Sequence, residues 1–107
     1  MDELGTLIQD LEKKDSLLEI LSDKYCRTIL EVIMYKPKSA IEITAETRIP
    51  ISTVYRRIQM LHDNKLLFTS GSISDEGKKF FLYKSKVKGI KSNFNNGQVE
   101  VELILNK

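Results

Sequence analysis

With 107 residues, the chain is long enough for one domain with a modest core and too short to include a cofactor-binding domain as well. Hydrophobic residues make up 41% and charged residues 30%, a mixture typical of folded rather than disordered proteins. No apolar run approaches the roughly 20 residues that span a bilayer. The acidic start, MDE, is unlike a signal peptide, so we expect a single cytoplasmic domain over residues 1–107 with no membrane partner.

The formal net charge of +2 is distributed unevenly along the chain. Residues 1–47 contain 6 Lys or Arg against 10 Asp or Glu, whereas residues 48–91 contain 10 against 3. The remaining residues, 92–107, contain 1 against 2. An anionic partner would therefore bind the basic middle of the chain.

The chain has one cysteine, Cys26, and one histidine, His62. A structural zinc site needs about four such ligands, so we expect no metal and no cofactor. A lone cysteine is most often a small buried apolar residue, and this is how we interpret Cys26. No nucleophile with an orienting partner and no phosphate-binding glycine loop stands out, so an enzyme is the weakest of the functions considered.

The first predicted helix covers residues 1–15, with acidic residues at its start and lysines at its end, and its apolar stripe consists of Leu4, Leu7, Ile8 and Leu11. A capping box of Ser16 with Glu19 predicts a second, short helix. A third helix begins at Ser22 and Asp23 and ends before Pro37, because the residue preceding proline is pushed out of helical geometry. Its core-facing residues are Cys26, Ile29, Leu30 and Ile33.

A second capping box, Ser39 with Glu42, predicts a fourth helix that ends near Thr47. Pro50 is tolerated in the first turn of the next helix, over residues 51–63, because its missing N–H donor would be unbonded there. Two short helices joined by a tight turn form a helix-turn-helix. The side of the second of these helices that faces the core consists of Ile51, Val54, Ile58 and Leu61.

From Leu66 onward the pattern changes from helices to strands. The runs LLFTSGSIS and KKFFLYKSK flank residues 75–77, which predicts a hairpin over residues 66–86 with Gly77 at a positive φ. A second hairpin, over residues 88–105, is predicted around a two-residue type I′ turn at Asn96 and Gly97. This turn pairs Phe94 with Val99, Ser92 with Val101 and Ile90 with Leu103 on one face, and Lys91 with Glu102 and Asn93 with Glu100 on the other.

The side of residues 51–63 that lies opposite the apolar side is polar, at a winding of about 100° per residue. Its donors and acceptors match base edges and phosphates, and Arg56 is the best placed to bind a guanine or two phosphates. Tyr55 and Arg57 lie on the flanks, where they would brace against the DNA backbone. A solvated helix face is the alternative, but the preceding helix and the basic hairpin favour nucleic-acid binding. The predicted DNA-binding residues are Arg48, Ser52, Thr53, Tyr55, Arg56, Arg57, Gln59, Lys78 and Lys79.

Residues 39–67, SAIEITAETRIPISTVYRRIQMLHDNKLL, are followed by a basic hairpin with a glycine at its tip. Together they resemble the winged helix-turn-helix of the ArsR-type transcriptional regulators, in the metal-free form common in archaea. The matching positions are Ala40, Glu42, Ile43, Ser52 to Ile58, Leu61, Leu66 and Leu67. Upstream, LLEILSDKYCRTILEVI is similar to another helix of the family at Leu18, Leu21, Ser22, Asp23, Arg27, Ile29 and Leu30.

This resemblance implies an α+β fold, a winged helix-turn-helix with an extra N-terminal helix and a second C-terminal β-hairpin. It also implies sequence-specific binding of double-stranded DNA by a homodimeric transcriptional regulator. The family's metal-sensing Cys-x-Cys motif is absent, because the matching helix reads EITAE. Thr44 replaces a usual alanine. Arg48 replaces the usual turn glycine, so either the turn avoids a positive φ or Arg48 accepts strain.

The apolar stripe of the first predicted helix has two alternative partners. It could meet its mate across a two-fold axis, or it could fold back over the chain's own core. We favour a homodimer, because the resemblance implies one and because the second hairpin adds apolar surface nearby. The predicted dimer contacts are Leu4, Leu7, Ile8 and Leu11.

A winged helix can also serve as a protein-interaction module in a transcription or repair assembly. The feature that distinguishes such a module would be apolar residues on the exposed face of residues 51–63. Only Met60 is expected there, so DNA binding is the preferred function.

Overall fold

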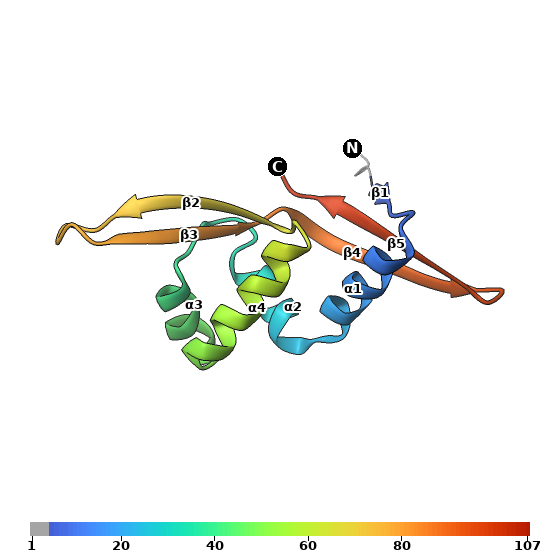
Figure 1. Ribbon diagram of the computed structural model, residues 1–107, viewed down its shortest axis with the longest axis horizontal. Helices are drawn as coiled ribbons and strands as arrows, with labels where there is room; N and C mark the ends of the chain where they lie inside the picture. The colour runs from blue at the N-terminus through green and yellow to red at the C-terminus, as the bar shows by residue number, and fades with distance from the viewer. Residues whose placement is uncertain (1–4) are drawn as a thin grey trace.

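The computed structural model describes residues 5–107, and the prediction for Leu4 lies outside this range. Within it, the protein has an α+β fold with four helices and five strands (Figure 1). None of these helices has the length and apolar content that crossing a membrane requires. The elements are β1 (Gly5–Leu7), α1 (Leu11–Ser22), α2 (Lys24–Val32), α3 (Ala40–Thr47), α4 (Ile51–Asp63), β2 (Leu67–Ile73), β3 (Lys79–Ser85), β4 (Val87–Asn95) and β5 (Gln98–Leu105).

The strands form two antiparallel sheets. One is the β2–β3 hairpin, and the other contains β1, β5 and β4 in that order. Figure 1 shows that the β2–β3 and β4–β5 hairpins extend toward opposite ends of the molecule, with the helices along one side of them. The molecule is therefore elongated, measuring 56 × 31 × 21 Å along its principal axes.

The core lies between the helices and the bases of the two hairpins. Fully buried side chains come from every helix and from β5, and they include Leu17, Ile20, Ile29, Ile33, Ile43, Val54, Leu61 and Val101. Cys26 is also fully buried, as predicted, and this burial raises the pKa of its thiol to about 12. Its thiol is therefore protonated at neutral pH and packs as an apolar group.

The helix predicted over residues 1–15 is wrong for the described residues 5–10. Gly5–Leu7 is a strand that pairs with β5, and the Ile8 amide donates to the Val101 carbonyl at 2.9 Å. The edge of β5 offers a row of unpaired backbone N–H and C=O groups, and residues 5–7 form hydrogen bonds with them as a strand instead of forming a helix. Ile8 is buried, so the prediction that it lies in an exposed dimer stripe is also wrong.

The two N-terminal helices predicted around Ser16 are one continuous helix. α1 begins after Asp10, whose carboxylate Oδ1 accepts from the Lys13 amide at 2.9 Å. Ser16 lies inside α1 instead of capping a new helix, because burial of Leu17 and Ile20 on one face keeps the helix continuous through that point. The N-cap therefore lies six positions earlier than the capping-box pattern indicates.

The predicted starts of the next helices are confirmed. Asp23 caps α2, and its Oδ2 accepts from the Cys26 amide at 2.8 Å. At α3, Ser39 Oγ accepts from the Glu42 amide at 3.1 Å while Glu42 Oε1 accepts from the Ser39 amide at 2.9 Å, which completes the capping box. α4 begins at Ile51 as predicted, but Pro50 is its N-cap residue and lies just before the first turn in which it was predicted.

The predicted core-facing side of α4 is confirmed for Val54, Ile58 and Leu61 and is wrong for Ile51. Ile51 is 40% exposed in the first turn, and Ile49, in the turn before it, is buried. Helical periodicity places a residue on a face but does not show how far the contact with the core extends along the helix.

Both hairpins have the predicted turns. Gly77 has φ 81° at the tip of the β2–β3 hairpin, and its amide donates to the Ser74 carbonyl at 2.9 Å. Asn96 and Gly97 have φ 54° and 75°, as a type I′ turn requires. Every predicted cross-strand pair of the second hairpin is confirmed, from Phe94 with Val99 to Ile90 with Leu103.

The two hairpins meet at a fixed corner, where β3 ends at Ser85 and β4 begins at Val87. Ser85 is fully buried, and its Oγ donates to the Val87 carbonyl at 2.7 Å while accepting from the Val87 amide at 3.1 Å. The Lys86 amide donates to the Leu66 carbonyl at 2.7 Å. The Asn106 side chain donates to the Ser85 carbonyl at 3.0 Å, so the C-terminal segment closes the corner.

Candidate nucleic-acid interface

The turn that joins α3 to α4 sets the position of the predicted recognition helix. Arg48 has φ 63° and ψ 15°, so it accepts the left-handed conformation and does not avoid it. Its amide donates to the Thr44 carbonyl at 2.8 Å. The Thr47 hydroxyl donates to the Ile43 carbonyl at 2.7 Å and accepts from the Ile49 amide at 3.2 Å, which fixes the turn from the other side.

The exposed face of α4 carries the predicted polar stripe. Ser52, Arg56 and Gln59 are exposed, and Thr53 is half-buried. Within residues 5–107, the Arg56 guanidinium has no hydrogen-bond or ionic partner. The Gln59 side-chain amide donates to Asp63 Oδ1 at 2.8 Å, so it is already engaged. Arg56 therefore has a charged group on this face that is free to bind a ligand.

Pro50 caps α4 without a side-chain hydrogen bond, so no side chain of the described residues caps the first amides of this helix. Those amides lie at the positive end of the helix dipole, next to the hydroxyls of Ser52 and Thr53. Together these groups suit the oxygen atoms of a phosphate.

Arg57, in contrast, is engaged inside the protein. Its Nε donates to Asp23 Oδ2 at 2.9 Å and its Nη2 to Oδ1 at 3.3 Å, and the guanidinium carbon lies 5.4 Å from the centre of the Tyr25 ring. This hydrogen-bonded ion pair lowers the pKa of Asp23 to about 2. The pair joins α4 to the N-terminus of α2. It fixes the orientation of α4 about its own axis with Arg57 facing α2 and Arg56 facing solvent.

A cleft separates the start of α3 and the middle of α4 from strand β3. Its volume is about 510 Å³, and its lining includes Ala40, Ile41, Tyr55, Lys79, Phe81 and Tyr83. We call it the α4–β3 cleft. The structure therefore brings the predicted residues Tyr55, Lys78 and Lys79 to one place, although they come from different elements.

A short backbone bridge holds the β2–β3 hairpin over α3. The Lys38 amide donates to the Tyr83 carbonyl at 3.0 Å, and the Tyr83 amide donates to the Lys38 carbonyl at 2.8 Å. The Lys38 ammonium also pairs with Glu46 near the end of α3. This bridge was not predicted, because a single pair of residues 45 positions apart leaves no periodic pattern in the sequence.

The aromatic lining of the cleft was not predicted either. Phe81 and Tyr83 alternate along β3 with Lys79, so the three side chains lie on one face of the hairpin. Leu67 and Ser85, on the same face at the base of the hairpin, are buried against the core. The alternation of residues along β3 indicates that they share a face of the hairpin. Only the burial of Leu67 and Ser85 at its base shows that this face is directed toward the helices.

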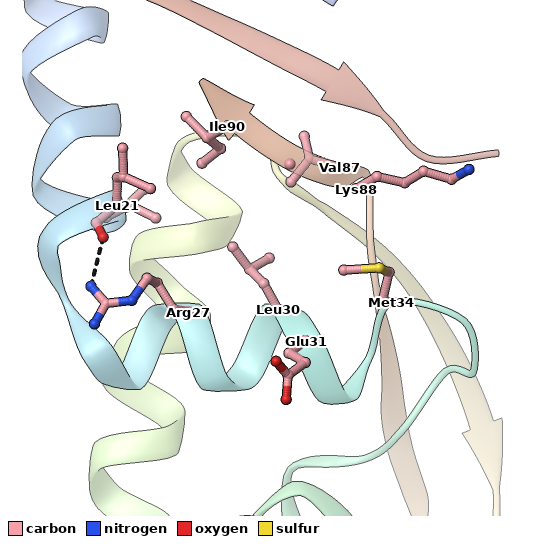
Figure 2. Close-up of a pocket in the computed structure, with 10 residues that line it drawn as sticks. Leu21, Arg27, Leu30, Glu31, Met34, Val87, Lys88 and Ile90 are labelled. Carbon is pink, nitrogen blue, oxygen red and sulfur yellow. Dashed lines mark hydrogen bonds between the residues drawn. The ribbon is translucent and has the colours of Figure 1, made fainter. Parts of the chain in front are cut away.

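A second hollow, of about 200 Å³, lies between α1, α2 and β4 (Figure 2). Figure 2 shows Leu30 and Ile90 on its walls and Arg27 donating to the Leu21 carbonyl, at 2.7 Å. None of the predicted DNA-binding residues lines it. It is a small, mainly apolar hollow separate from the α4–β3 cleft.

No known family model matches the chain, and no curated protein matches it. Among residues 5–107, no three side chains of His, Cys, Asp or Glu come close enough together to hold a metal ion. The function of the chain must therefore be inferred from the geometry of α3, α4 and the β2–β3 hairpin.

Proposed function

We propose that the protein binds double-stranded DNA as a transcriptional regulator of the winged helix-turn-helix class, similar to metal-free ArsR-type regulators. In this proposal α3 and α4 form the helix-turn-helix, α4 enters the major groove, and the β2–β3 hairpin is the wing. The observation that carries the proposal is Arg56, exposed on α4 and without a partner in the described chain, beside the free N-terminus of that helix.

The residues of the interface have different roles in this proposal. Arg56 binds a guanine edge or two phosphates, and Ser52 and Thr53 bind phosphate at the start of α4. Arg48 and Tyr55 contact the DNA backbone on either side of α4. Gln59 contacts a base after its hydrogen bond to Asp63 breaks. Lys78 and Lys79 reach phosphate or minor groove from the wing. Arg57 is not included, because it is bound to Asp23.

The electrostatic pattern supports the same surface. Residues 48–91, which contain α4 and the wing, have 10 basic and 3 acidic side chains. A phosphate backbone binds such a surface by releasing counterions, which makes the affinity strongly dependent on salt. We therefore expect the affinity for duplex DNA to fall steeply as salt is raised.

The substitution Arg56→Ala tests this proposal. We expect a loss of about 1 to 3 kcal/mol in binding free energy on the preferred duplex if Arg56 binds a guanine. If it binds phosphate instead, the slope of affinity against salt should fall by about 1. Fluorescence anisotropy on labelled duplexes, between roughly 50 and 200 mM salt, measures both quantities.

Arg27→Ala is the matched control, because it removes the same charge from an exposed position on α2. It should change neither the affinity nor its salt dependence by a comparable amount. If Arg56→Ala binds duplex DNA like the unmodified protein, with the same salt slope, the proposed role of α4 is wrong.

A second function is favoured by apolar side chains beside the polar stripe. Ile41 is 72% exposed and Ile51 is 40% exposed, at the N-terminal ends of α3 and α4. A protein-interaction module would use such side chains as contacts. In that case Ile41→Glu should abolish a stable complex with a protein partner, while Arg56→Ala leaves it intact and duplex DNA binds only weakly.

A further inference from the structure

The α4–β3 cleft has aromatic side chains on both walls. Tyr55 projects from α4 and is 52% exposed, and Phe81 projects from β3 and is 47% exposed. Tyr83 follows Phe81 on the same face of β3 and is half-buried toward the core. Two half-exposed rings that line one cleft offer stacking surface to a flat aromatic group.

The ring of Phe81 is open on the side of its neighbouring strand. Its cross-strand partner is Gly71, which has no side chain to cover the ring. A methyl group placed at Gly71 would meet only the ε-carbon of Lys79, at 3.8 Å. Of the space beside Phe81 that a cross-strand side chain would fill, only the Lys79 side chain, which is exposed and flexible, occupies a part.

The mouth of the cleft is basic. Lys78 and Lys79 lie at the wing side, and the Lys79 ammonium is 5.7 Å from the centre of the Phe81 ring. One carboxylate, Glu76, opposes these two ammonium groups among the lining residues. A ligand that combines a flat aromatic ring with a negative charge beside it matches both properties.

We propose that the α4–β3 cleft binds one unpaired nucleobase of DNA, stacked on Phe81 with Tyr55 opposite and its phosphate beside Lys79. This inference deepens the proposed function and rests on it, since the wing must first be brought to DNA. A base inside an intact duplex is stacked on both sides and cannot enter, whereas an extruded base can. The volume, about 510 Å³, lies within the range of clefts that bind small ligands.

The test compares a blunt duplex with the same duplex carrying one unpaired fluorescent adenine analogue, whose emission is quenched by stacking. Stacking on an aromatic side chain is worth enough to give about a 10-fold preference for the unpaired base. We expect that preference, together with quenching, for the unmodified protein. Phe81→Leu should remove both while leaving the affinity for the blunt duplex unchanged, because Phe81 is not among the proposed duplex contacts.

Two further variants sharpen the result. Gly71→Val fills the space beside Phe81 and should also remove the preference, although the ring is still present. Phe94→Leu makes the same chemical change as Phe81→Leu at an exposed position on the other hairpin, so it should keep both the preference and the quenching.

The outcomes separate this inference from the function on which it rests. If the protein binds the blunt duplex through Arg56 but shows no preference for the unpaired base, the proposed role of the cleft is wrong and the proposed function still holds. A preference that survives Phe81→Leu also overturns it. If the preference for the unpaired base depends on Phe81 while Arg56→Ala has no effect on duplex binding, the role of the cleft is supported and the proposed duplex contact of Arg56 is wrong. Failure to bind either DNA overturns both.

Discussion

Arg48 occupies a backbone conformation that favours glycine. Its φ of 63° costs a residue with a side chain about 1 kcal/mol relative to glycine. The side chain is exposed just before α4, so a strained turn places a positive charge beside the proposed interface. The proposed contact with DNA would account for an arginine at a position where the local geometry alone favours glycine.

The substitution Arg48→Gly should therefore have opposite effects on stability and on binding. We expect the free energy of unfolding to rise by about 1 kcal/mol, measured by urea denaturation. The salt slope of duplex binding should fall by about 1, because one phosphate contact is lost.

Lys65→Gly is the control for Arg48→Gly, since Lys65 also has a positive φ, 59°, but follows the other end of α4. It should stabilise the protein similarly and leave binding unchanged. A variant Arg48→Gly that binds duplex DNA with an unchanged salt slope would show that Arg48 does not contact the backbone.

Arg56 and Arg57 show how much of the candidate site the sequence can predict. Helical winding separates two adjacent side chains by about 100°, so it correctly indicated that they point in different directions. It could not indicate that Arg57 binds Asp23, because the two residues are 34 positions apart and meet only when α2 packs on α4. The exposed face of α4 was predictable from helical periodicity. The ion pair that takes Arg57 away from this face was not.

At the scale of elements, Asp23 connects two helices through one carboxylate. The same group caps α2 and accepts from Arg57 of α4, and both side chains of the ion pair are less than a third exposed. The pKa of Asp23 is lowered from 3.8 to about 2 in the folded protein, so folding favours the charged form. By linkage, this contribution to stability is fully present above about pH 4 and is lost as the pH falls through about 2.

Asp23→Asn isolates this charge, because asparagine caps a helix as well as aspartate does. We expect a loss of about 2 kcal/mol in the free energy of unfolding at neutral pH. Denaturation of both proteins across a pH series should show the difference shrinking toward pH 2. Asp15→Asn, at an exposed position on α1, should change stability little, and a pH-independent difference for Asp23→Asn would contradict the role of its charge.

The elements that were predicted correctly are those with local signals. The capping box of α3, the Asn-Gly turn and the alternation along β4 and β5 each depend on residues close together in the sequence. Residues 5–7 form a strand only because β5 offers a free edge to them, and β5 lies about a hundred residues away. The Ser16 pattern failed for a related reason, since burial of Leu17 against the rest of the core outweighs a local capping preference.

At the scale of the whole molecule, the residues predicted to form the dimer contact have two different environments. Ile8 is buried in the chain's own core, which is the fold-back alternative, while Leu7 and Leu11 are exposed. Leu11 is 74% exposed on α1, and the nearby end of the second hairpin adds Phe94, which is 71% exposed. A homodimer therefore stays a prediction, now resting on Leu7 and Leu11. In such a dimer, the two copies of α4 would lie one turn of DNA apart, ~34 Å.

Leu11→Glu tests the dimer. If the unmodified protein is a dimer, a carboxylate at this position should convert it to a monomer, because burying an unpaired charge in an apolar interface is costly. Light scattering coupled to size-exclusion chromatography measures the mass directly. Ile41→Glu introduces the same charge at an exposed apolar position on α3 and should leave the mass unchanged. An unmodified protein that is monomeric at the concentrations where it binds DNA would contradict the prediction.

Ser85 and Val87 are separated by one residue, so the chain has no linker between its two hairpins. Hydrogen bonds from Lys86 to Leu66 and from Asn106 to Ser85 hold this joint on both sides. The two hairpins are therefore joined directly, and they extend in opposite directions along the molecule, which is 56 Å long. Partners bound at the two hairpin tips would therefore lie at opposite ends of the molecule.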